Sequence, residues 1–246
     1  MQIKIKQGDC LELMKEIPDK SIDMILCDLP YGTTHNKWDT ALPFDKLWKQ
    51  YKRIIKDHGT IALFGDGMFI ADIMQSNKKW WRYNLVWNKV LPSGFLNANK
   101  MPLRSHEEII IFYNKLPTYH PQKTVGAPNH SKGTPKECIN NNYNTFKFKQ
   151  TNDSNLKHPK SILTFSKPHP SISQHPTQKP IALLEWLIKS YTNEGETVLD
   201  NCMGSGSTGV ACINENRNFI GYELNEEYFN IAQNRLREAW KEKYEK

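Results

Sequence analysis

The sequence predicts an α/β fold built on a mostly parallel sheet with helices on both faces. Three observations lead to this prediction. Short apolar runs, typical of buried strands, alternate with longer segments whose apolar residues recur at helical spacing. A glycine-rich turn directly follows one predicted strand and leads into the start of a helix. A chain of 246 residues is also long enough for one domain to bury a substantial core.

The individual elements are predicted from the spacing of apolar residues. Residues 22–27 form a short apolar run that is typical of a strand buried in a sheet. Residues 44–55 carry their apolar side chains on one face of a helix, and residues 59–64 form a second buried strand. Alternating strands and helices favour parallel strands, whose ligands bind at their carboxyl ends. The further predicted elements are strands at 85–87, 109–112, 197–199 and 218–222 and helices at 181–191, 209–213 and 226–244.

The end of the strand at 22–27 carries four residues that we predict to be catalytic, Asp28, Leu29, Pro30 and Tyr31. The exocyclic amine of a nucleobase is a poor nucleophile because its lone pair is delocalised into the ring. The Asp28 carboxylate and the Leu29 carbonyl can accept hydrogen bonds from such an amine and so favour a tetrahedral nitrogen. Pro30 fixes its own φ and biases the preceding residue towards an extended conformation, which aims that carbonyl. Tyr31 offers a stacking face to a base that is turned out of the double helix.

A nucleotide-binding turn is predicted at residues 200–208, between a strand and a helix. Glycines let the backbone approach a ligand closely, and the free amides of a helix N-terminus favour an anionic group. The next strand ends at an acid, at about the distance where a dinucleotide-binding unit places the acid that binds the ribose. The predicted ligand residues are Asp200, Gly204, Gly206, Ser207, Thr208 and Glu223.

Together the two sites resemble the DNA amino-methyltransferases of the beta class, in which the catalytic tetrapeptide precedes the cofactor motif. The resemblance spans nearly the whole chain and includes residues 8–14 and the His-Pro-Thr-Gln-Lys-Pro segment at 175–180. It is strongest to the adenine-specific enzymes of phages and restriction-modification systems. It implies a Rossmann-like methyltransferase fold, S-adenosyl-L-methionine as the cofactor and double-stranded DNA as the partner. It also implies that Asp9 lies near the adenine of the cofactor and that Thr177 and Lys179 line its methionine end.

The resemblance implies that the enzyme methylates N6 of adenine at specific sites in DNA. Asp28 and the Leu29 carbonyl would hold the amine while Tyr31 stacks on the flipped base. The methyl group is already activated, so neither a metal nor a covalent intermediate is expected. The chain departs from the family pattern at two places. Leu29 replaces a proline, which is tolerated because that position acts through its carbonyl, and Asn201-Cys202 replaces Pro-Phe, which bears on how tightly the cofactor is held.

Three alternatives remain open. Methylation of cytosine at N4 uses nearly the same geometry, although family members with that activity commonly have serine at the position of Asp28. Methylation of RNA or of a glutamine amide uses a related tetrapeptide, but the protein-modifying relatives generally place the cofactor motif first. A DNA-binding module with a vestigial nucleotide pocket would be the non-enzymatic alternative, and the combination of Asp28, Tyr31, Gly204 and Gly206 argues against it.

The positive charge is concentrated in one segment. Residues 115–179 hold ten lysines and two acids, a net charge of +8, whereas the whole chain carries +7. We therefore predict a basic, loop-rich target-recognition insert at 115–174, within a catalytic domain formed by residues 1–114 and 175–246. Lysines in such an insert meet phosphates, while exposed amides and aromatics reach bases. A second loop, at 92–100, is expected to close over the flipped base.

Composition excludes several other classes of protein. Hydrophobic residues make up 38% of the chain, and no apolar stretch approaches the roughly 20 residues that a membrane helix requires. The five cysteines include no CxxC pair, which argues against a disulfide framework and a zinc site. No apolar secretory run follows Met1, so a cytoplasmic location is expected. Related enzymes often form dimers, and a homodimer is expected on that ground alone.

Overall fold

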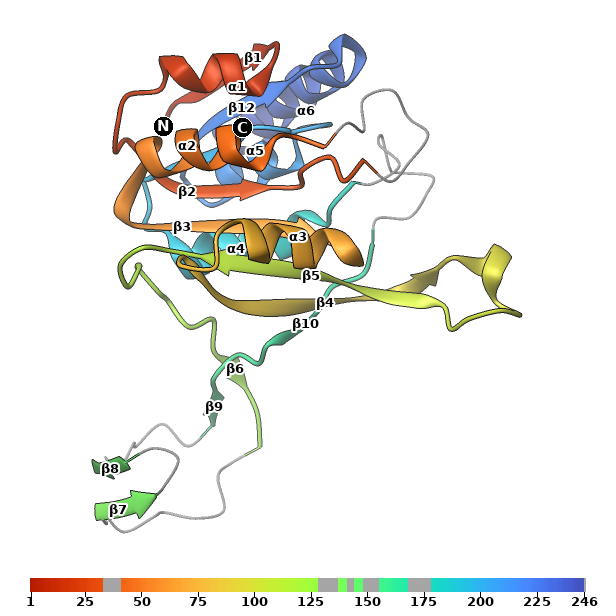
Figure 1. Ribbon diagram of the computed structural model, residues 1–246. Coiled ribbons are helices and arrows are strands. Elements are labelled where there is room, and N and C mark those ends of the chain that lie inside the picture. Colours follow the sequence, from red (N-terminus) through yellow and green to blue (C-terminus); the bar gives the residue numbers. More distant parts are fainter. Residues whose placement is uncertain (33–40, 128–136, 141–143, 148–154, 168–177, 246) are drawn as a thin grey trace. The chain divides into compact units, whose positions relative to one another are not determined.

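The computed structural model describes residues 1–32, 41–127, 137–140, 144–147, 155–167 and 178–245 (Figure 1). The chain divides into two compact units. The larger unit comprises residues 1–120 and 161–246, and the smaller unit comprises residues 121–160.

The larger unit is built on an eight-stranded sheet with the order β1-β12-β11-β2-β3-β5-β4-β10. All neighbouring strands are parallel except β5, which is antiparallel to both β3 and β4. The mostly parallel sheet expected from the sequence is thus confirmed, and β5 reverses because it follows β4 through a hairpin. The strands are β1 (Ile3–Gln7), β2 (Ile22–Cys27), β3 (Ile55–Gly65), β4 (Trp81–Ser93), β5 (Arg104–Phe112), β10 (Ile162–Thr164), β11 (Thr197–Asp200) and β12 (Asn218–Glu223).

Helices cover both faces of this sheet, as predicted (Figure 1). One face carries α1 (Cys10–Leu13), α2 (Phe44–Ile54) and α3 (Met68–Ser76). The other face carries α4 (Ile181–Tyr191) and α5 (Ser207–Asn214), and α6 (Glu226–Tyr244) packs with α5. Two short 3-10 helices, η1 (Met14–Glu16) and η2 (Phe95–Asn97), complete the unit within the described residues.

The central strands are apolar on both faces because each face is covered. In β5, Ile109 and Ile111 belong to the core cluster that includes α4, while Ile110 and Phe112 belong to the cluster that includes α2 and α3. The same alternation places successive residues of β2 and β3 on opposite faces. This arrangement explains why the sequence shows continuous apolar runs here rather than an alternation of apolar and polar residues.

The β4–β5 hairpin projects from the edge of the sheet at which β2 ends (Figure 1). β4 runs in the same direction as β2 and β3, since β3 and β4 are both antiparallel to β5. The loop expected at 92–100 therefore forms the tip of a long hairpin and contains η2. Phe95 and Leu96 at the tip are 78% and 82% exposed. Closure of this tip over a base stays a prediction.

The smaller unit has two short antiparallel pairs, of β6 (Thr124–Val125) with β9 (Leu156–Lys157) and of β7 (Glu137–Asn140) with β8 (Asn144–Lys147). Its bounds of 121–160 differ from those of the predicted insert, 115–174. The amides of Lys115 and His120 donate hydrogen bonds to the larger unit, and β10 pairs with β4 in the main sheet. Whether the insert reads DNA stays a prediction. Among the described helices, none is long and apolar enough to cross a membrane.

Candidate active site

A cavity of about 460 Å³ lies at the carboxyl ends of β2 and β11, a size typical of sites for small molecules. Parallel strands bring their carboxyl ends to one edge, which is why two segments about 170 residues apart in sequence meet there. The cavity is lined by these predicted site residues: Asp9, Asp28, Leu29, Pro30, Tyr31, Lys179, Asp200, Gly204, Ser207, Thr208 and Glu223. Gly206 does not line it, and Thr177 lies outside the described residues.

Both carboxylate oxygens of Asp28 are engaged. Oδ1 accepts a hydrogen bond of 2.8 Å from the Tyr31 hydroxyl, and Oδ2 accepts one of 2.6 Å from Nζ of Lys179. Asp28 follows the last residue of β2 directly, so a strand buried on both faces fixes its backbone. A base amine would compete with the Tyr31 hydroxyl for Oδ1.

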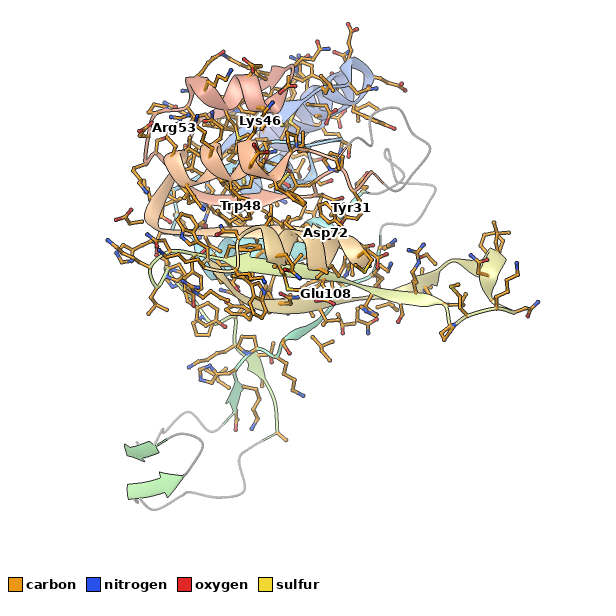
Figure 2. All side chains as sticks on the ribbon, viewed as in Figure 1. Tyr31, Lys46, Trp48, Arg53, Asp72 and Glu108 are labelled. Atoms are coloured by element: carbon orange, nitrogen blue, oxygen red, sulfur yellow. The ribbon has the colours of Figure 1, made fainter. Side chains whose placement is uncertain are left out.

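Tyr31 lies beyond the end of β2 and beside α3 (Figure 2). Its ring stacks on Phe69 of α3, with 4.5 Å between the ring centroids and 29° between the planes. Burial, followed by the charge of Asp28, raises the pKa of Tyr31 well above 10, so the hydroxyl stays protonated and acts as a donor. Phe69 thus supports one face of the tyrosine ring. This residue was not expected from the sequence, where Met68 to Ser76 gave no sign of facing the catalytic tetrapeptide.

Lys179 lies between two carboxylates. Its Nζ is 2.6 Å from Oδ2 of Asp28 and 3.2 Å from Oε2 of Glu107, and it lies 4.9 Å from the centroid of the Phe64 ring. Burial disfavours the ammonium form, but the charges of Asp28 and Glu107 outweigh it and raise the pKa of Lys179. Lys179 lines the cavity, and its ion pairs are with the predicted catalytic acid and with Glu107.

The glycine turn is closed by Glu223. Its Oε2 accepts a hydrogen bond of 2.8 Å from the amide of Gly204, and its Oε1 accepts one of 2.8 Å from the amide of Asn225, which caps α6. Gly204 has a φ of 51°, a left-handed conformation that glycine adopts without strain. An ionised carboxylate has about four acceptor positions, so the backbone hydrogen bonds to Glu223 leave acceptor capacity for a ligand hydroxyl.

Gly206 serves helix packing in this structure. It has a φ of 77°, and a side chain there would place Cβ 3.0 Å from Cβ of Ala232 in α6. Gly206 precedes α5 directly, so its small size lets α6 approach the start of that helix. Ser207 and Thr208, in the first turn of α5, face the cavity instead.

Asp200 is buried at the end of β11, with 4% of its surface exposed. Oδ2 accepts a hydrogen bond of 2.6 Å from the Thr208 hydroxyl, and Oδ1 accepts one of 3.2 Å from the amide of Cys202. Burial raises the pKa of Asp200 to about 7, although these hydrogen bonds oppose the change. The carboxylate therefore ties the strand to the turn and to the helix that follows it.

Asn201, a departure from the family pattern, is also part of this framework. Its Oδ1 accepts a hydrogen bond of 2.5 Å from the Tyr51 hydroxyl of α2. Asp9 caps α1 by accepting a hydrogen bond of 2.7 Å from the amide of Leu11. Both residues line the cavity, so the same side chains that stabilise the surrounding structure also form its wall.

The charge of the cavity wall favours a cationic group. Among the described lining residues there are four acids and one cation, Lys179. The acids are Asp9, Asp28, Asp200 and Glu223. Within the same described residues, no cluster of three or more histidines, cysteines, aspartates or glutamates could hold a metal ion.

Comparison with known sequences gives a family match over most of the chain. A sequence model of the family described as DNA methylase matches residues 22–234. The chain is 28% identical over 242 residues to the Type II methyltransferase M.HpaI of Haemophilus parainfluenzae, covering 93% of this chain and 72% of that protein. It is 27% identical over 246 residues to the DNA adenine methyltransferase YhdJ of Escherichia coli strain K12, covering 94% and 82% respectively.

Solved structures show the same architecture. The structure of M1.HpyAVI in complex with SAM has a TM-score of 0.62 at 26% identity, covering 96% of this chain and 100% of that one. The cytosine-N4-specific PvuII DNA methyltransferase has a TM-score of 0.68 at 18% identity, covering 96% and 86%. The second likeness is one of fold alone.

Proposed function

Because this chain belongs to the DNA methylase family, we propose that it transfers a methyl group from S-adenosylmethionine to N6 of adenine in DNA. One observation carries the proposal: Asp28 and Tyr31 line the same cavity as Glu223 and Gly204. A base amine held by the first pair and a nucleoside cofactor held by the second would therefore share one cavity. Proximity of this kind accounts for a large part of the acceleration in a bimolecular reaction.

The cavity fits S-adenosylmethionine by its charge and its donors. Glu223 has acceptor positions left for the ribose hydroxyls, and Asp9 borders the region proposed for the adenine ring. The amides at the start of α5 suit the methionine carboxylate. The acids of the wall suit a sulfonium. When bound, the cofactor supplies a methyl group on a positively charged sulfur, which is an activated leaving group.

The protein's own part in the reaction is to hold the base amine. Asp28 accepts one amine hydrogen through Oδ1 once the Tyr31 hydroxyl has given way, and the Leu29 carbonyl accepts the other. The Tyr31 ring, backed by Phe69, stacks on the flipped base. These two acceptors favour a tetrahedral nitrogen whose lone pair is free to attack. After transfer the nitrogen loses its extra proton to solvent.

The DNA partner is proposed to meet the basic segment. Residues 115–179 carry +8, more than the whole chain, and lysines supply the salt-dependent part of DNA affinity. YhdJ is named a DNA adenine methyltransferase, which supports adenine as the target. A homodimer and a cytoplasmic location stay predictions.

Cytosine N4 methylation is the second candidate, because the PvuII enzyme has the same fold. Both reactions are tested by one experiment. Duplex DNA is incubated with the protein and isotopically labelled S-adenosylmethionine, digested to nucleosides and separated by mass spectrometry. Label in N6-methyladenine supports the proposal, label in N4-methylcytosine supports the second candidate, and no label in either base refutes both.

A further inference from the structure

A chain of alternating charges runs from the predicted catalytic acid into the protein. Lys179 contacts Asp28 at 2.6 Å and Glu107 at 3.2 Å, and Nζ of Lys89 lies 3.2 Å from the other oxygen of Glu107. Lys167 adds a third cation, 3.8 Å from Glu107. The side chains of Lys89, Lys179 and Glu107 are only 2%, 10% and 12% exposed. Burying these charges is costly unless they are paired, and here each has a partner of opposite sign.

The sheet sets the geometry of this chain of charges. Glu107 in β5 pairs in register with Trp87 in β4, so the two side chains share a face of the sheet. Lys89 lies two residues after Trp87 in β4 and is therefore on the same face. Lys179 comes shortly before α4, which packs on that face. Its ammonium lies 4.9 Å from the ring centroid of Phe64 and 6.0 Å from that of Trp87, which adds cation–π attraction. Rigid strands on one side and a helix on the other thus locate the cation beside Asp28.

Glu107 is placed to control how strongly Lys179 binds Asp28. It does not line the cavity, so its effect on a ligand must pass through another side chain. Its Oε2 is buried, and the ammonium of Lys179 lies 3.2 Å from it, so the two opposite charges attract each other directly. That attraction draws the ammonium away from Asp28. Without it, Lys89 and Lys167 would repel Lys179 towards Asp28.

We propose that Glu107 and Lys179 are positioning residues for methyl transfer, which hold the Asp28 carboxylate with Oδ1 directed to the substrate amine. The proposal rests on the proposed function and adds two residues to it. Lys179 fixes Oδ2, so the carboxylate cannot rotate away from the base, and Glu107 keeps Lys179 from neutralising Asp28 entirely. This role of Lys179 differs from one in binding the cofactor, because Lys179 contacts Asp28, the acid proposed to hold the base amine.

The test is a double-variant cycle on Glu107→Gln and Lys179→Met. Turnover is measured as labelled methyl groups transferred to duplex DNA, and affinity for S-adenosylmethionine is measured by calorimetry. Glu107→Gln should lower kcat by about tenfold to a hundredfold, as small displacements of reacting groups do, while the cofactor affinity stays within about twofold. The double variant should be no slower than Lys179→Met alone, because Glu107 acts through Lys179.

Glu215→Gln is the matched control. Glu215 is also a partly buried glutamate paired with a lysine, 3.1 Å from Lys189, but it does not line the cavity or contact Asp28. Its kcat should equal that of the parent. If Glu107→Gln does not fold, Glu107→Asp is measured in its place. Aspartate keeps the negative charge, but its shorter side chain places the charge farther from Lys179, so kcat should also fall.

Three results would overturn the inference. The first is a folded Glu107→Gln variant whose kcat is within twofold of that of the parent. The second is a double variant in which the losses of kcat from the two single substitutions multiply. The third is an affinity of Glu107→Gln for S-adenosylmethionine that falls by the same factor as its kcat. A parent protein that transfers no methyl group contradicts the proposed function instead. An active parent with an insensitive Glu107 contradicts only the inference drawn from this chain of charges.

Discussion

Replacing Asp200 by asparagine should remove a distinct part of the pH dependence of stability. Asp200 is buried, and its pKa is about 7 in the folded protein against an ordinary value of 3.8. Between these pH values the folded chain keeps a proton that the unfolded chain has lost. The free energy of unfolding therefore falls as the pH rises from about 4 to about 7, and this contribution is constant above that range.

The size of the effect follows from the two pKa values. Their difference corresponds to roughly 4 kcal/mol of unfolding free energy, at about 1.4 kcal/mol per pH unit. Asp200→Asn has no such proton to lose. The variant should therefore gain roughly 4 kcal/mol over the parent as the pH rises from about 4 to about 7. The substitution also changes the hydrogen bonds to Thr208 and Cys202. This change shifts the free energy of unfolding of the variant by the same amount at every pH, so it does not alter how the difference between variant and parent depends on pH.

Urea unfolding followed by circular dichroism, from about pH 4 to about pH 8.5, measures this difference directly. Asp57→Asn is the control, because Lys115 and Lys20 lower the pKa of Asp57 to about 2. That aspartate stabilises the folded chain above its ordinary pKa and loses the effect only in stronger acid, so its difference curve should be flat over the range measured. A difference between Asp200→Asn and the parent that does not change with pH would refute the reasoning.

Two further predictions concern the cofactor and DNA. Glu223→Ala should weaken S-adenosylmethionine binding by tenfold or more in calorimetry, because it removes a ribose acceptor and the hydrogen bond to the Gly204 amide. Unchanged affinity would show that Glu223 does not bind the cofactor. Changing Lys123, Lys157 and Lys160 to glutamine should reduce the salt dependence of DNA affinity, by up to about one unit of slope per lysine that contacts phosphate. If the salt dependence of DNA affinity were the same in this variant and the parent, these three lysines would not contact the phosphates.

The sequence predicted the central strands well because they are buried on both faces, and the chief helices well because each buries one apolar face. β2, β11 and β12 carry apolar residues on both faces, and such runs end at the residues that form the site. β1 and α3 were not predicted. β1 alternates lysines with isoleucines, Ile3 and Ile5, at the edge of the sheet, and a short polar and apolar alternation of this kind is easily missed.

The site was harder to predict where it depends on tertiary contacts. Asp28 and Glu223 lie at the ends of strands, and the apolar runs in the sequence show where those strands end. Lys179 and Glu107 are 72 residues apart, and only the packing of α4 on the sheet brings them together. Gly206 has the pattern of a ligand glycine but packs against α6, because one glycine motif serves both purposes.

The most direct test of the central claim separates cofactor binding from transfer in Asp28→Ala. Asp28 accepts hydrogen bonds on both oxygens, whereas the glycine turn is held independently by Glu223. S-adenosylmethionine affinity should therefore stay within about threefold of the parent, while formation of N6-methyladenine in duplex DNA is lost. Near-normal formation of N6-methyladenine by this variant would contradict the account.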